Sequence, residues 1–432
     1  MSGSRPTFTE ALRFWVKLGF ISFGGPTGQI AIMHDEVVEK KKWITEDQFL
    51  HALNYCMILP GPEAQQLATY IGWLLHRTPG ALVAGALFVL PSAVLLWLLS
   101  FIYVRFGEVP WITWIFDGLK PTVVAIVAHA VIRIGSRVLR KPVAWALAAS
   151  AFIAIYFMGV PFPVIILTAG LIGLLGGRLR PATFNVLKGH GQPVSTEQDV
   201  SSDSAATGTG LGRAARILMT GVVLWASPIV AAALVLGGQH SITKEGLFFS
   251  KAAMVTFGGA YAVLPYVAQQ AVERYGWLSG PSMLDGLGLA ETTPGPLIMV
   301  VQFVGFVGAW NHPGELPPIV AATLGAAMTT WVTFVPCFLW ILLGAPYVER
   351  MRANVSLNSA LSAITAAVVG VILNLAVWFA LQVFFVEPAG IQWFAICVAA
   401  SAMILLIRFK VSVALLVLSG AAAGLAFHAL AR

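Results

Sequence analysis

Long apolar runs without a charged residue divide the chain. Crossing a bilayer as a helix takes roughly 20 apolar residues, and five charge-free runs are long enough: 81–104, 143–177, 217–238, 317–348 and 361–386. The run 143–177 has room for two helices and predicts a hairpin that turns near Gly159-Val160-Pro161. Apolar stretches at 119–132, 392–407 and 411–428 bring the expected number of continuous spans to about nine. The pattern predicts an all-α polytopic membrane protein.

Two short Gly/Pro motifs interrupt apolar sequence, and both occur twice. Phe23-Gly24-Gly25-Pro26 returns as Phe257-Gly258-Gly259, and Pro60-Gly61-Pro62-Glu63 returns as Pro294-Gly295-Pro296. One ungapped shift of 234 residues relates both pairs, since 257 − 23 and 294 − 60 give the same number. The shift also places identical residues opposite Phe14, Lys17, Val38, Glu39, Trp43, Leu50 and Leu53. We infer that the chain contains two homologous copies of one unit.

Each motif predicts a broken or re-entrant helix. Glycine lacks a Cβ and proline lacks an N–H, so neither motif can lie inside a regular helix. We expect a helix over 7–22, a short helix from Pro26, and a charged loop from His34 to Asp47. Irregular backbone at membrane depth is tolerated where protein or a water-filled cavity satisfies it. The broken ends of the two copies are therefore expected to meet at mid-membrane.

The repeat also predicts the domain organisation. The expected segments are a first repeat (1–141), a two-helix hairpin (142–180), a linker (181–213), a connecting transmembrane helix (214–243), a second repeat (244–386) and C-terminal transmembrane helices (387–432). The linker is rich in Ser, Gly, Thr, Asp and Gln and almost lacks large apolar residues. That composition is typical of a flexible segment, here expected in the cytoplasm.

Loop charges predict how the two copies face. Cytoplasmic loops carry an excess of Lys and Arg, which explains the net charge of +7 without a nucleic-acid partner. Arg137 to Lys141 and the basic residues of the linker place both ends of the hairpin inside. The loop 311–316 has no Lys or Arg and is expected outside, whereas Lys40 to Lys42 and Arg77 place the matching loops of the first copy inside. The two repeats are therefore expected to be inverted.

The sequence shows no catalytic or metal-binding pattern. It contains no Gly-x-Ser-x-Gly, no Walker-type phosphate loop and no His-Glu-x-x-His, and its eight histidines are dispersed. Cys56, Cys337 and Cys397 are scattered in apolar context, so we expect buried free thiols. Asp117 and Lys120, three apart on an expected helix, are interpreted as an internal ion pair. No enzymatic activity, metal or cofactor is expected.

The breaks create helix N-termini inside the membrane, after Gly25, Pro62, Gly259 and Pro296. Each N-terminus carries about +0.5 charge and free N–H groups, which favour an anion. A tetrahedral oxyanion suits several convergent N–H groups because its acceptor oxygens point in all directions. The break glycines and nearby polar residues expected at such a site are Gly24, Gly25, Thr27, Gly61, Gly258, Gly259, Thr292, Thr293, Gly295 and Gln302. Gln65 and Gln66 either line this site or hold helices together.

Four charged residues near the breaks have alternative interpretations. Lys17 and Lys251 are equivalent in the repeat and either line the anion path or extend to the lipid headgroups. Glu63 and Glu291 are not equivalent, since the shift places Leu297 opposite Glu63. An ionised carboxylate beside the site would repel an anion. Each Glu therefore takes up a coupling proton, pairs with Lys or Arg, or satisfies its own helix turn.

The repeated motifs resemble those of the chromate ion transporter family in its long two-domain form. The matching segments are Phe23-Gly24-Gly25-Pro26, 59–68, Thr256-Phe257-Gly258-Gly259-Ala260-Tyr261, 291–296 and Gln302-Phe303-Val304-Gly305. The resemblance covers roughly 8–136 and 244–386. It implies a multi-pass inner-membrane protein with two antiparallel domains. It further implies gradient-driven export of chromate, with sulfate as analogue or counter-substrate and chromate resistance as phenotype.

Other functions stay open on the sequence. Chromate and sulfate are nearly isosteric, so a transporter of sulfate or another divalent oxyanion, an exchanger and a passive anion channel are all compatible with these motifs. An intramembrane enzyme acting on a lipid phosphate would need a nucleophile or base beside the breaks, and the dispersed histidines do not supply one. The lipid bilayer is the expected environment, and a homodimer is compatible with the chain.

Overall fold

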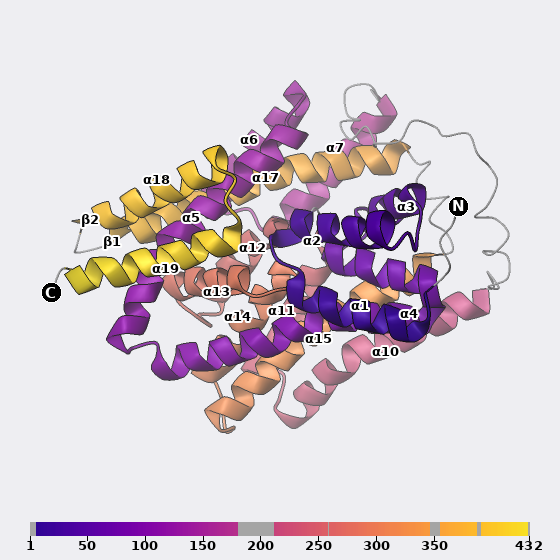
Figure 1. Cartoon of the computed structure of the whole chain (residues 1–432), viewed down its shortest axis with the longest axis horizontal. Coiled ribbons are helices and arrows are strands. Elements are labelled where there is room, and N and C mark those ends of the chain that lie inside the picture. The colour runs from indigo at the N-terminus through magenta and orange to yellow at the C-terminus, as the bar shows by residue number, and fades with distance from the viewer. Residues whose placement is uncertain (1–5, 180–210, 258, 346–354, 387–389, 431–432) are drawn as a thin grey trace.

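The computed structural model describes residues 6–179, 211–257, 259–345, 355–386 and 390–430, which are mostly helical (Figure 1). The elements of the N-terminal part are α1 (Phe8–Ile21), α2 (Gly25–His34), the π-helix η1 (Asp35–Lys40), α3 (Glu46–Cys56), α4 (Glu63–Phe106), α5 (Pro110–Val138), α6 (Pro142–Tyr156) and α7 (Phe162–Leu179). Next come α10 (Leu211–Val235), α11 (Ser241–Met254), α12 (Ala260–Ala268), the π-helix η2 (Gln269–Arg274) and α13 (Gly280–Thr292). The remainder consists of the 3₁₀-helix η3 (Leu297–Met299), α14 (Val300–Asn311), α15 (Pro318–Gly344), α17 (Val355–Phe384), β1 (Phe385–Val386), β2 (Gly390–Ile391), α18 (Trp393–Arg408) and α19 (Val413–Leu430).

These helices confirm an all-α polytopic membrane protein. Among the described residues, seven helices are long and apolar enough to cross a membrane, and three shorter apolar helices accompany them. The hairpin predicted at 143–177 is present as α6 and α7, which turn at Gly159 with a φ of +62°. One small departure from helix is the antiparallel pairing of the two-residue strands β1 and β2.

The two copies fold alike at their N-terminal ends. α1, α2, η1 and α3 recur as α11, α12, η2 and α13, and the π-helices fall at equivalent positions, 35–40 and 269–274. The backbone bonds that end the π-helices recur as well: Trp43 N–H donates to Val37 O over 2.9 Å, and Trp277 N–H donates to Ala271 O over 2.8 Å. The duplication inferred from sequence is therefore also a duplication of local structure.

α4 consists of two helical arms that run in opposite directions. His76 and Arg77 leave the helical region, with a φ of +55° at Arg77. A Cβ on either Gly72 or Gly80 would collide with the backbone carbonyl oxygen of the other, so the two arms of α4 pack antiparallel at their glycines. Small residues permit such close approach of helices. In the second copy α14 and α15 form the corresponding hairpin.

The two copies differ in how deeply their short helices are buried. Every residue of α12 is buried, whereas Gln29 and Met33 are the buried residues of α2. α17, α7, α6 and α5 pack together, α18 and α19 lie against α5, and α10 lies along α15 (Figure 1). The break of the second copy is therefore enclosed, and the break of the first copy is more open.

Three expectations differ from the structure. The loop expected from His34 to Asp47 is largely helical, since α2 continues into η1, along which Lys40 Nζ lies 2.6 Å from Asp35 Oδ2 and 3.2 Å from Glu36 Oε1. Cys397 is exposed on α18, while Cys56 and Cys337 are buried as expected, and all three are free thiols. The linker up to residue 210 lies outside the described residues, and residues 211–213 already belong to α10.

Candidate functional site

The broken segments of the two copies meet in a reciprocal exchange of backbone hydrogen bonds. Gly61 N–H donates to Thr256 O over 2.8 Å, and Gly295 N–H donates to Ser22 O over 2.8 Å. Gly61 and Gly295 are equivalent in the repeat, as are Ser22 and Thr256. An exchange in which each partner makes the same contact indicates an approximate two-fold axis between the copies. The Pro-Gly-Pro break of each copy therefore docks on the Gly-Gly break of the other.

Both docking positions require glycine. Gly61 has a φ of +126° and Gly295 a φ of +103°, a region that residues with a side chain rarely adopt. A Cβ on Gly61 would lie 2.8 Å from both Cys337 Sγ and Gln66 Nε2, and a Cβ on Gly295 would lie 2.8 Å from Ser92 Cβ. Because the flanking prolines have no N–H, the glycine N–H is the donor that each motif offers at this point.

Side chains satisfy the backbone around the exchange. The hydroxyls of Ser22 and Thr256 each donate over 2.6 Å to the carbonyl four residues earlier in their own helix. Gln29 Nε2 donates to Ser22 O over 3.3 Å and also to Gly295 O. Gln29 is buried, and its Oε1 has no hydrogen-bond partner among the described residues. Gln29 thus links the break of the first copy to that of the second.

Two helix starts converge on Glu63. This half-buried residue is the first of α4, and its Oε1 lies 3.9 Å from where a Cβ would stand on Gly259, the residue before α12. The positive ends of one helix from each copy therefore meet at one carboxylate. In the part of the chain that the structure describes, this carboxylate has no hydrogen bond or ion pair.

Glu291 lies in a different environment. Tyr261, the second residue of α12, donates its hydroxyl to Glu291 Oε1 over 2.6 Å, and both side chains are buried. Arg133 of α5 interacts electrostatically with both of them. The charge of an α5 cation therefore acts on the carboxylate near the end of α13.

Replacing Tyr261 by phenylalanine is expected to lower the free energy of unfolding by about 1–3 kcal/mol, because a buried carboxylate oxygen loses its donor. The measurement is the thermal unfolding midpoint of the detergent-purified protein. Tyr156→Phe is the control, since Tyr156 is exposed on α6 and should tolerate the loss of its hydroxyl. Equal midpoints for the two variants would show that the hydroxyl of Tyr261 contributes nothing to stability.

Three buried glutamines brace this region. Gln65 Nε2 donates to a threonine of its own helix over 3.1 Å, Gln66 Nε2 donates to Pro60 O over 2.8 Å, and Gln302 Nε2 donates to Ala93 O over 2.7 Å. The Oε1 atom of each has no hydrogen-bond partner among the described residues. Gln66 therefore holds the Pro-Gly-Pro turn, and Gln302 joins α14 to α4.

The two repeated lysines lie on exposed helix faces. Lys17 Nζ is 3.6 Å from Glu36 Oε1. Lys251 is exposed near the end of α11, and among the described residues it has no ion pair. The repeat places Gln270 where the first copy has Glu36, which explains why Lys251 lacks the corresponding partner.

The remaining predicted residues lie around the breaks. Gly24 and Thr27 are exposed, and Gly25 is half-buried at the start of α2. The hydroxyls of Thr292 and Thr293 donate to carbonyls three residues earlier, over 2.6 Å and 2.9 Å, so in this structure their protons are used within the helix end. Gly258 lies outside the described residues.

Sequence reasoning missed several residues of this centre, namely Ser22, Gln29, Arg133, Thr256 and Tyr261. A signal for two of them was present, because the repeat places a small hydroxyl residue before each Phe-Gly-Gly motif. Gln29 has no counterpart, since Val263 occupies its position in the second copy. Arg133 lies within α5, four residues before the basic loop that was assigned to the cytoplasm from Arg137 onward.

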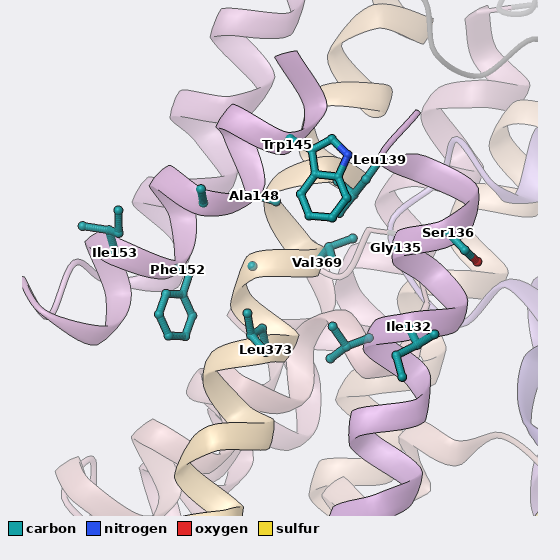
Figure 2. Close-up of a pocket in the computed structure, with 13 residues that line it drawn as sticks. Ile132, Gly135, Ser136, Leu139, Trp145, Ala148, Phe152, Ile153, Val369 and Leu373 are labelled. Carbon is teal, nitrogen blue, oxygen red and sulfur yellow. The ribbon is translucent and has the colours of Figure 1, made fainter. Parts of the chain in front are cut away.

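A large apolar groove lies apart from the breaks, among α5, α6 and α17. Figure 2 shows its lining, which includes Trp145, Phe152 and Leu373 around a floor at Gly135 and Val369, and its volume is about 600 Å³. None of its lining residues is charged. The groove therefore offers nothing to bind an oxyanion, and its apolar walls suit lipid chains.

Comparisons with known proteins agree with the repeated motifs. The family model described as "Chromate transporter" matches residues 9–174 and 244–425. The chain is 28% identical over 372 residues to the chromate transport protein of Cupriavidus metallidurans, covering 85% of this chain and 82% of that one. It is 29% identical over 368 residues to the chromate transport protein of Pseudomonas aeruginosa, covering 85% and 79%. It is 33% identical over 116 residues to the uncharacterized transporter YwrA of Bacillus subtilis, covering 27% of this chain and 65% of that one.

No solved structure matches the chain. The family match spans most of the sequence and contains both Gly-Gly breaks and both Pro-Gly-Pro breaks. The chain therefore belongs to the chromate transporter family.

Proposed function

We propose that this protein is a secondary transporter that exports chromate across the cytoplasmic membrane. The observation that carries the proposal is the reciprocal docking of the breaks, which brings the starts of α4 and α12 together at Glu63. Two helix N-termini aimed at one point favour an anion there. Chromate is the proposed cargo because relatives that align over most of this chain are named chromate transport proteins.

The oxyanion binds, in this proposal, where α4 and α12 begin. Glu63 occupies the positive helix ends when the site is empty. A dianion and an ionised carboxylate repel each other, so Glu63 must take up a proton or swing away when the oxyanion arrives. Break glycines leave room for an anion to approach the backbone N–H groups.

The oxyanion reaches this site through the first copy, because α2 is less buried than its counterpart α12. The exposed faces of α2 and Lys17 give access from the first copy, while α12 closes the second. Lys251 attracts the anion on the other side when the arrangement reverses. Inverted repeats that exchange open and closed states around a fixed central site account for the open first copy and for the closed second copy.

Sulfate is the expected competitor. Both anions are tetrahedral dianions, and backbone N–H groups recognise that shape without distinguishing the central atom. Sulfate is therefore expected to inhibit chromate transport or to serve as a counter-substrate.

The test is uptake of labelled chromate by everted membrane vesicles, with and without an imposed proton gradient and with sulfate as competitor. Gradient-dependent, sulfate-sensitive uptake supports the proposal. Uptake that does not depend on any gradient would identify a channel. Uptake no greater than that of vesicles lacking the protein would rule out a transport function. The matched control is a membrane that carries the Gly295→Ala variant.

A further inference from the structure

A polar cavity lies on the opposite end of α13 from the breaks. It has a volume of about 400 Å³ and is lined by parts of α4, α5, α13 and α14. Its lining includes the exposed Glu108 of the α4–α5 turn and Asp285, which is 4% exposed. A polar cavity of this size has room for water. The cavity therefore connects an exposed turn with a buried carboxyl group through its lining.

Asp285 belongs to a chain of charged groups that crosses three helices. Tyr103 of α4 donates its hydroxyl to Asp285 Oδ2 over 3.0 Å, and Lys120 Nζ of α5 lies 3.8 Å from Asp285 Oδ1. The same Nζ lies 3.6 Å from Asp117 Oδ1, which confirms the internal ion pair expected from sequence. His428 Nε2 of α19 lies 3.1 Å from Asp117 Oδ2.

The charges of these groups do not balance when both carboxyl groups are ionised and His428 is neutral. Two carboxylates share one ammonium, so the cluster is neutral only if one further proton is present on His428 or on a carboxyl group. Asp285 Oδ1 has no hydrogen bond among the described residues and faces the lysine at a distance too long for one. Its lone pairs are therefore not engaged by a hydrogen-bond donor among these residues, although the atom itself is buried.

The surroundings of Asp285 contain few other titratable groups. Those that face it are Tyr103 from α4, Glu108 from the cavity mouth, Asp117 and Lys120 from α5, and His428 through Asp117. α14 contributes Val307, Trp310 and Asn311 to the lining, none of which titrates, and α17 and η3 contain no titratable residue in their sequence. Among the described residues no group of three or more His, Cys, Asp or Glu could hold a metal ion.

We propose that Asp285 is the site that takes up the coupling proton, separately from the oxyanion site, and that Lys120 moves its ion pair from Asp285 to Asp117 when the proton binds. The proton comes from solvent through the cavity, binds Asp285 Oδ1 and later returns to solvent on the other side of the membrane. Lys120 stays protonated throughout. Two observations favour a proton over a metal cation. The ammonium of Lys120 lies between the two carboxyl groups, and the described residues contain no group of His, Cys, Asp or Glu that could hold a metal ion.

α13 connects this proton site to the anion site. Asp285 and Glu291 are six residues apart on the same helix, which is about 9 Å along its axis. The helix ends at Thr292, three residues before Gly295 docks on Ser22. Releasing Asp285 from Lys120 removes the ion pair between α13 and α5, so protonation in the cavity changes how firmly the second break is held.

The test rests on the proposed function and separates gradient-driven accumulation from exchange. Everted vesicles that carry Asp285→Asn are expected to lose at least tenfold of the chromate accumulation driven by an acid-inside pH gradient. Counterflow of labelled chromate against unlabelled chromate, which needs no net proton movement, is expected to stay within twofold of wild type. Asp47→Asn, on an exposed residue in the first turn of α3, is the matched control and should change neither.

A second variant covers the case in which Asp285→Asn fails to fold. Tyr103→Phe removes a hydrogen bond that stabilises the charged form of Asp285. The pH at which accumulation is half-maximal is therefore expected to rise by about one unit. Normal accumulation by Asp285→Asn, loss of counterflow by Asp285→Asn protein that is folded and inserted in wild-type amounts, accumulation driven by a sodium gradient instead, or an unshifted pH profile in Tyr103→Phe would overturn the proposal. Wild-type vesicles without accumulation or counterflow would overturn the proposed function instead.

Discussion

Replacing Gly295 by alanine is expected to reduce chromate uptake to the level of vesicles that lack the protein. Its φ of +103° costs a residue with a side chain about 1–3 kcal/mol. The new Cβ would also lie 2.8 Å from Ser92 Cβ, and α4 cannot retreat without moving the hairpin that it forms. Each 1.4 kcal/mol is about a tenfold loss of the docked state. Transport rates in everted vesicles, normalised to the amount of inserted protein, measure the effect.

The control for this variant is Gly237→Ala. Gly237 has a φ of +92° but nothing within 4 Å of its would-be Cβ, so it carries a similar backbone cost without the collision. We expect it to retain most of its transport. Because the docking is reciprocal, Gly61→Ala should behave like Gly295→Ala. Transport by either break variant at the rate of the Gly237 variant would contradict a functional role for the docked breaks.

Replacing Glu63 by glutamine is expected to tighten oxyanion binding by about tenfold or more and to slow turnover. The carboxylate at the start of α4 repels a dianion, whereas an amide of the same size does not. Tighter binding is expected to slow release of the anion, because charge repulsion from Glu63 no longer assists its dissociation. The measurement is the concentration dependence of initial uptake rates, from which KM and the maximal rate are separated.

Two further variants sharpen this test. Glu63→Asp keeps the charge, so its KM should stay near that of wild type. Glu315→Gln removes a carboxylate from an exposed loop far from the breaks in sequence and should leave both constants unchanged. A KM for Glu63→Gln equal to or above that of wild type would mean that the oxyanion does not bind beside this carboxylate.

Hydrophobic runs and Gly/Pro breaks predict much of this fold because both act locally. A charge-free run needs no partner to be recognised as a span, and two prolines around Gly61 break any helix by themselves. The duplication is equally readable, since one shift aligns both motifs. A loop at Arg77 was likewise predicted, but the close antiparallel packing across it was not, because it depends on Gly72 and Gly80 fitting together.

The site was predicted less completely than the fold, and for a physical reason. The break glycines follow from local chain stiffness, but their partners lie in the other copy. The bond from Gly61 to Thr256, the contact of Glu63 with Gly259 and the reach of Gln29 to Gly295 all join residues far apart in sequence. Arg133 was not singled out because its partners Tyr261 and Glu291 lie in the second copy.

The exchange of backbone bonds between the copies has a consequence for biosynthesis. The ribosome synthesises Gly61 long before Thr256, and Ser22 long before Gly295. During synthesis the Gly61 N–H and the Ser22 carbonyl therefore lack their hydrogen-bond partners in the second copy. Neither half can form these two bonds alone, so a chain that ends after its first half leaves the Gly61 N–H and the Ser22 carbonyl without these partners.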